Sequence, residues 1–149
     1  MEIKTALLQQ CLEYVNARLQ TVEETIQSHR KALSSETKSS AGDKHETGRA
    51  MLQLEMEKAG QQLTSILQMK ETLSRINIAK KSSAVSLGTL VETNSGTYFI
   101  SVSAGEITLD SKNYFAISIA SPIGKLMLGK KAGEELIWNG KEINIHKIS

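Results

Sequence analysis

The sequence predicts an α+β protein in which a long antiparallel helical hairpin, a coiled coil, precedes a small antiparallel β domain with one short helix. Composition changes near residue 80: residues 1–78 hold no proline and few glycines, whereas the rest holds the only proline and nearly all aromatic residues. Apolar residues follow a helical spacing in the first part and partly alternate in the second. We therefore predict a hairpin over residues 1–78, a linker over 79–84 and the β domain over 85–149.

The predicted hairpin depends on two apolar stripes. In each stripe apolar residues recur at steps of three and four, which is the spacing of one helix face. The pattern fades over residues 34–43, where Ser, Gly and Asp supply turn and capping chemistry. The stripes contain Ile3, Leu7, Cys11, Val15, Leu19, Val22 and Ile26 before this break, and Met51, Leu54, Leu63, Ile66, Leu67, Leu73 and Ile76 after it.

Two helices follow from these stripes, over residues 3–34 and 46–76, with the tip of the hairpin near residues 40–46. Matching the stripes about the turn brings Leu19 and Val22 opposite the region of Ile66 and Leu63. A hairpin roughly 50 Å long is too thin to bury much and is suited to reaching a distant site. The periodicity also allows half of a homodimeric four-helix bundle.

Short strands and turns make up the β domain. The Asn139-Gly140 pair between alternating segments is a strong signal for a hairpin turn. Pro122 before a short apolar run predicts one short helix, which Gly129 and Gly133 end. The segments expected to contain strands are 85–93, 97–104, 113–120, 135–139 and 141–148.

Charge and cysteine content restrict the function. The chain has 18 basic and 16 acidic residues and a net charge of +2, which argues against direct binding of duplex nucleic acid. The single cysteine, Cys11, excludes a disulfide framework and a Cys-based metal site within one chain. No run approaches the ~20 apolar residues of a membrane span, and no nucleotide-binding loop or nucleophile motif is present. We expect a cytoplasmic protein without an autonomous catalytic site.

Two motifs resemble those of the Gre transcript-cleavage factors. Residues 121–130, SPIGKLMLGK, are similar to the S-P-I-[GA]-x-x-[LI]-[LI]-G-K segment of the FKBP-like C-terminal domain in that family. Residues 42–46, GDKHE, resemble the G-D-x-x-E of the family's acidic hairpin tip. Both motifs occur in the family's order, so the resemblance covers nearly the whole chain.

The resemblance implies a transcription elongation factor that binds RNA polymerase and inserts its tip into the polymerase secondary channel. At the tip, Asp43 and Glu46 would help to hold a Mg²⁺ ion that is shared with polymerase and not stably bound by the factor alone, and backtracked RNA would be cleaved there. The RNA 3′ end and DNA would be met only through the complex, and we expect the factor to be monomeric. The residues assigned to polymerase binding are Ser121, Pro122, Ile123 and Gly124.

The tip also allows a purely structural interpretation, because Asp43 followed by Glu46 has the spacing of a capping box. Where the family continues with E-N-A-E-Y, this chain has E-T-G-R-A, so Arg49 replaces an acid and Ala50 an aromatic residue. Together with Lys44, the arginine weakens the local attraction for a divalent cation. His45 lies beside the acids, but a lone histidine in a polar turn is usually only solvated.

Three functions are therefore open. The first is stimulation of RNA cleavage through the tip carboxylates. The second is a regulator or inhibitor that occupies the same channel without promoting cleavage, which the altered tip makes plausible. The third is an FKBP-like prolyl isomerase or chaperone, which the 4% aromatic content disfavours because a proline-binding pocket needs several aromatic walls.

Overall fold

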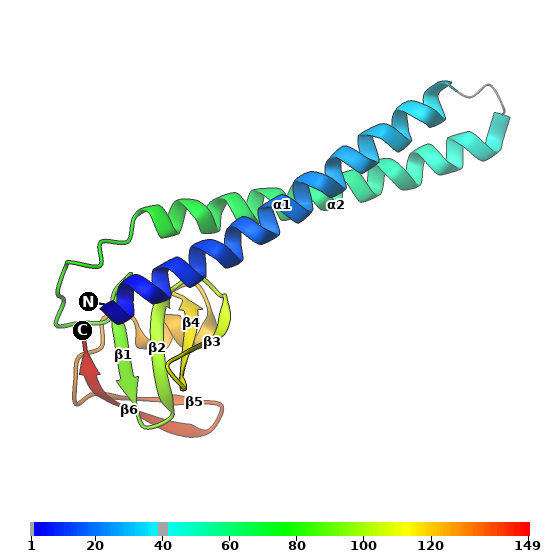
Figure 1. Ribbon diagram of the computed structural model, residues 1–149. Helices are drawn as coiled ribbons and strands as arrows, with labels where there is room; N and C mark the ends of the chain where they lie inside the picture. Colours follow the sequence, from blue (N-terminus) through cyan, green and yellow to red (C-terminus); the bar gives the residue numbers. More distant parts are fainter. Residues whose placement is uncertain (1, 39–41) are drawn as a thin grey trace. The chain divides into compact units, whose positions relative to one another are not determined.

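The computed structural model describes residues 2–38 and 42–149, and the side chains of residues 2–35 and 47–149 (Figure 1). Two long helices paired as a hairpin precede a six-stranded sheet with one short helix, which confirms the predicted α+β class. Among the described residues no helix has the length and apolar character to cross a membrane. The elements are α1 (Glu2–Lys38), α2 (Gly42–Ser74), β1 (Leu90–Thr93), β2 (Gly96–Ser101), β3 (Gly105–Leu109), β4 (Lys112–Ser118), α3 (Pro122–Met127), β5 (Glu135–Trp138) and β6 (Lys141–Ile148).

The two helices of the hairpin run antiparallel (Figure 1), and both extend further toward the tip than the sequence pattern predicts. In α1 the predicted stripe is buried at Leu7, Cys11, Val15 and Val22. Val22 and Gln62 line one shallow depression, so the register lies close to the predicted one. Good helix formers without proline explain why both helices are uninterrupted.

The predicted stripe of α2 is partly wrong, because Met51, Leu54 and Leu67 are exposed by 47% or more. The buried residues are Ala59, Ile66 and Leu73, seven residues apart, and half-buried side chains occupy the intervening seam positions. A seven-residue repeat is the period of a coiled coil, in which only two positions of each heptad face the partner helix. A stripe chosen by apolar character alone includes residues that lie beside this seam. The half-buried residues along this side of α2 include Leu52, Met56, Leu63 and Met69.

The chain divides into two compact units: Val15–Lys70, which is the tip side of the hairpin, and Met1–Tyr14 together with Glu71–Ser149. The second unit therefore contains the first turns of α1 as well as the sheet. Inside it the buried Cys11 thiol lies 3.6 Å from the Ser101 hydroxyl at the end of β2, within hydrogen-bonding distance for sulfur. The hairpin, linker and domain boundaries proposed from the sequence remain a prediction.

The six strands form one sheet in the order β3-β4-β2-β1-β6-β5. β1 and β2 form a hairpin through a turn at Asn94 and Ser95, and β5 and β6 form a second hairpin. The second turn is the predicted pair Asn139-Gly140, whose positive φ angles of 51° and 75° fit a hairpin turn that twists with its strands.

The prediction of an antiparallel sheet fails at one pair of strands, because β2 and β4 run parallel over the register Thr97↔Tyr114 to Ser101↔Ser118. After β2 the chain passes to the edge position as β3 and returns as β4 between β3 and β2. Because β4 is antiparallel to β3 and lies between β3 and β2, it runs parallel to β2. Alternation along each segment gives the faces of a strand but not its neighbours, so the sequence cannot reveal this pairing.

Strand β3 was missed from the sequence. It pairs with β4 through a turn at Asp110 and Ser111, which both adopt positive φ angles of 49° and 65°. Left-handed turn residues are usually Gly or Asn, so this pair gives no clear signal for a hairpin.

The core of the sheet unit is a cluster of buried aliphatic side chains on which α3 packs through Met127. Tyr98, Ile117, Ile119, Ile123, Trp138 and Ile148 are partly buried against it. The cluster therefore draws on four strands and fixes the position of α3 and of the turns at its ends. Its buried members are Val85, Val91, Ile100, Met127, Leu136, Ile143 and Ile145.

Candidate functional site

The segment that links β4 to α3 is a tight corner built around Ser121. The Ser121 backbone is extended (φ −70°, ψ 157°), as expected for the residue that caps a helix. Its hydroxyl donates to the Ser118 carbonyl oxygen at 2.6 Å and accepts from the Gly124 backbone N–H at 3.1 Å. Pro122 follows at the first helical position, where its missing N–H is not needed. Ser121 thus connects the end of β4 to the first turn of α3.

Gly124 is required in this corner for steric reasons. A Cβ atom at residue 124 would lie 1.9 Å from the Ser118 carbonyl oxygen and 2.9 Å from the Ser121 hydroxyl oxygen. Real Cβ contacts are essentially never below 3.0 Å, and the nearest atom is backbone that cannot rotate away. The helix can approach the strand this closely only because residue 124 lacks a side chain.

The far end of α3 is fixed to the segment before β1. The Gly129 N–H donates to the Val85 carbonyl at 2.9 Å, and the Val85 N–H donates to the Lys130 carbonyl at 2.8 Å. Met127, which precedes Gly129 and Lys130 in the chain, is fully buried. The backbone of the corner is therefore held at both ends, which lowers the entropy cost of presenting it to a partner.

The corner leaves several apolar side chains exposed. Leu126 and Leu128 are 41% and 49% exposed, Pro122 is exposed and Ile123 is half-buried against the core. We call Pro122, Leu126 and Leu128 the α3 apolar surface. Pro122 and Leu126 are four residues apart and share one side of the helix. The centre of a protein interface is typically apolar, so this surface suits a protein partner.

The structure gives the predicted binding residues different positions. Ser121 is engaged in capping and Gly124 is buried, so both shape the corner, whereas Pro122 is open to a partner and Ile123 partly so. Leu126 and Leu128 were not singled out from the sequence. The sequence shows that Leu126 lies one helical turn after Pro122. It does not show that Leu126 and Leu128 are exposed, because that depends on Met127 pointing into the core.

The predicted tip residues Asp43 and Glu46 belong to the first turns of α2. Their side chains lie outside the described residues, so their role in Mg²⁺ binding and the alternative capping box remain predictions. Arg49, the first charged residue of α2 with a described side chain, is exposed. Within the described part of the chain no group of three His, Cys, Asp or Glu side chains could hold a metal ion.

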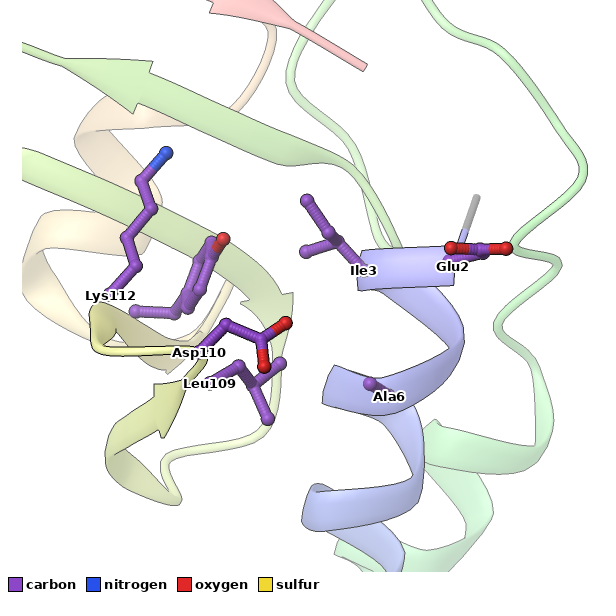
Figure 2. A pocket seen from close by; sticks show the side chains of 7 residues that line it. Glu2, Ile3, Ala6, Leu109, Asp110 and Lys112 are labelled. Atoms are coloured by element: carbon purple, nitrogen blue, oxygen red, sulfur yellow. The ribbon is translucent and has the colours of Figure 1, made fainter.

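The pocket in Figure 2 has a volume of about 560 Å³ and lies between the start of α1 and the β3–β4 hairpin. Glu2, Ile3 and Ala6 line it from the helix, Asp110 and Lys112 line it from the hairpin, and Figure 2 shows the Ile3 side chain pointing toward the hairpin. The Lys112 amino group lies 5.6 Å from the centre of the Tyr114 ring, a cation–π distance. Among the described residues that line it there is no Ser, Thr, Cys or His that could act as nucleophile or base in the manner of a catalytic triad.

A smaller pocket of about 240 Å³ contains two of the aromatic residues, Tyr98 and Trp138. Its other lining residues are Ser95, Asn139, Lys141 and Ile143. Small-molecule sites usually measure about 300–1,000 Å³ and have mainly apolar walls. The pocket is therefore small and polar for a site that binds proline.

Residues 79–149 match the family model described as "Transcription elongation factor, GreA/GreB, C-term". This part of the chain is therefore similar to the C-terminal domain of the GreA/GreB factors. The matched range contains the whole sheet, the Ser121 corner and the α3 apolar surface, whereas the hairpin lies outside it. Gre factors are accessory factors rather than autonomous enzymes.

The chain is also similar to a solved structure described as "Structure of the transcription factor Gfh1", with 24% sequence identity, 91% of each chain covered and a TM-score of 0.36. A search of curated proteins finds no significant match.

Proposed function

We propose that this Gre-like protein binds RNA polymerase through its sheet unit and inserts the hairpin tip into the secondary channel, where it stimulates cleavage of backtracked RNA. The observation that carries the proposal is the Ser121–Gly124 corner. It lies in the matched domain, its backbone is fixed by capping and by the absence of a Cβ atom, and apolar side chains surround it.

Binding would centre on the α3 apolar surface. Burying an apolar side chain that is half-exposed in the free protein removes apolar area from water, and each such anchor contributes about 1 kcal/mol or more. Lys125, which is exposed on the same helix, would add attraction for an acidic partner surface. Because the backbone of the corner is already fixed, binding costs little conformational entropy there.

Cleavage would depend on Asp43 and Glu46. Mg²⁺ prefers oxygen ligands and often takes only one or two carboxylates from a protein, so two acids on one turn could complete a site that polymerase supplies in part. Two-metal hydrolysis then uses one ion to activate the attacking water and the other to stabilise the leaving oxygen. The factor would need no catalytic site of its own for this.

The second candidate is a regulator that occupies the channel without promoting cleavage. The observation that favours it is the charge of the tip sequence, in which Lys44 lies between the two acids and Arg49 follows them. A cation within the screening distance of about 8–10 Å opposes the binding of a second divalent ion. Binding to polymerase is common to both candidates.

The docking proposal is tested by measuring the affinity of polymerase for the full chain and for Leu126→Ser. We expect at least tenfold weaker binding, because one anchor of the α3 apolar surface is lost. Ile137→Ser is the matched control, since Ile137 is 70% exposed on β5 and outside this surface, and it should change the affinity less than twofold. Equal affinities for Leu126→Ser and wild type would contradict docking through α3.

A further inference from the structure

Lys4 is a lysine with a buried side-chain stem, and its ammonium group has no counter-ion in the described part of the chain and is open to a pocket. It lies in the first turn of α1 and is only 5% exposed. The described residues offer its ammonium group neither a hydrogen bond nor an ion pair. Desolvation by this burial lowers the pKa of Lys4 below its usual value. Lysines are almost never buried unless they are paired, because the charge loses its hydration.

The Lys4 side chain lines a pocket of about 440 Å³ within the sheet unit. The pocket is formed by the first turn of α1, the segment after α2 and the neighbouring strands β1 and β6. Its volume falls within the range of small-molecule sites. The lining residues are Ile3, Lys4, Ile78, Lys81, Ser82, Leu90, Glu92, Lys147, Ile148 and Ser149.

The charged side chains of this pocket have a net positive charge. Lys81 and Lys147 join Lys4, and among the described residues Glu92 is the one acidic side chain in the lining. Glu92 and Lys147 are opposite each other in the β1–β6 register. Among the described residues, these two side chains form no ion pair. The three lysines outnumber the glutamate and the terminal carboxylate of Ser149, so the charge of the pocket stays positive, and four aliphatic side chains form the remaining wall.

We propose that this pocket is a binding site for a small phosphate monoester that carries a compact apolar group. A phosphate monoester has a charge of about −1.5 to −2 near neutral pH and three acceptor oxygens, so it can pair with more than one of the three lysines, whereas a carboxylate has one charge and two oxygens. Lysine ammonium groups bind phosphate oxygens as point charges with short, charge-assisted hydrogen bonds. Ile3, Ile78, Leu90 and Ile148 would cover the apolar group. The site is independent of polymerase binding.

The test is calorimetric titration of the full chain with phenyl phosphate at pH 7.5 and low salt. Phenol, which lacks the phosphate, and inorganic phosphate, which lacks the ring, are titrated alongside. We expect phenyl phosphate to bind at least tenfold more tightly than either, because it alone satisfies both the lysines and the aliphatic wall. Absence of phenyl phosphate binding, or equal binding of phenyl phosphate and phenol, would overturn the proposal.

Lys4→Met assigns the binding to this pocket, since methionine keeps the length of the side chain and removes the charge. We expect at least tenfold weaker binding of phenyl phosphate. Lys80→Met is the matched control: it removes the same charge from an exposed lysine that does not line the pocket, and it should change binding less than twofold. Equal losses in both variants would mean that only the net charge of the chain attracts the ligand, which contradicts the site.

Lys147→Met covers the case in which the buried substitution prevents folding. Lys147 is exposed at the edge of the pocket, so its replacement leaves the core intact. It should weaken phenyl phosphate binding at least fivefold. Unchanged affinity in Lys147→Met would refute the proposed site.

Discussion

Replacing Gly124 by alanine should destabilise the sheet unit more than any other single added methyl group in the corner. The new Cβ atom would lie 1.9 Å from the Ser118 carbonyl oxygen, so the two atoms have to separate by about 1.5 Å to reach ordinary contact. The carbonyl belongs to the end of β4 and also accepts the Ser121 hydroxyl hydrogen bond. Strand, cap and helix would therefore have to move together.

The size of the effect follows from two costs. Forcing an additional carbon into a packed region costs about 1–3 kcal/mol. Separating α3 from β4 also breaks the Ser121 cap, which contributes about 1 kcal/mol. We expect the free energy of unfolding of Gly124→Ala to be lower by about 2–4 kcal/mol. For a domain of this size the melting temperature should fall by about 10–25 °C.

The assay is urea denaturation followed by fluorescence of Trp138, the only tryptophan, which packs against the core of the sheet unit. Gly129→Ala is the control in the same segment: it has a φ of 83° and nothing within 4 Å of an added Cβ. That substitution should cost only the strain of a left-handed backbone, about 1 kcal/mol. A Gly124→Ala midpoint equal to that of Gly129→Ala would refute the steric argument.

Two further predictions concern the hairpin and the buried thiol. Ile66→Ala should lower the free energy of unfolding by about 2–4 kcal/mol because Ile66 is 1% exposed in the α2 seam, whereas Leu67→Ala, at 47% exposure, should change it by less than 1 kcal/mol; similar losses in thermal unfolding would contradict the seam. Burial raises the pKa of Cys11, and the hydrogen bond with Ser101 only partly opposes this. The unfolded chain therefore releases the thiol proton first as the pH rises, so wild type should lose stability relative to Cys11→Ala above about pH 8.5. Urea denaturation at pH 7 and pH 10 measures this difference, and a difference independent of pH would contradict the shift.

Features that are set by neighbouring residues in the chain can be predicted from the sequence, whereas features that depend on distant segments cannot. The Asn139-Gly140 turn and the start of α3 at Pro122 are set by backbone preferences of the residues themselves, and both were predicted correctly. The parallel pairing of β2 with β4 depends on the path of β3, whose turn at Asp110 and Ser111 has no glycine. Asp110 and Ser111 are both exposed, and the pairing of β3 with β4 on either side of the turn accompanies a conformation that local propensity disfavours.

The candidate site follows the same division. The motif identified residues 121–124, but only the structure separates Ser121 and Gly124, which shape the corner, from Pro122, which is open to a partner. The Lys4 pocket has no sequence signal, because three segments far apart in the chain contribute its lysines. At the tip the resemblance alone assigns Asp43 and Glu46.

The central claim is tested most directly by RNA cleavage in a backtracked polymerase complex, with polymerase binding measured in parallel. The full chain should shorten the RNA from its 3′ end in the presence of Mg²⁺. Asp43→Asn and Glu46→Gln should each abolish most of this cleavage with affinity unchanged within twofold, because the amides keep the shape but lose the charge that favours Mg²⁺. Arg49→Glu should increase cleavage at low Mg²⁺. A full chain that binds polymerase but gives no cleavage at any Mg²⁺ concentration, or tip variants that cleave as well as wild type, would contradict the proposed role of the carboxylates.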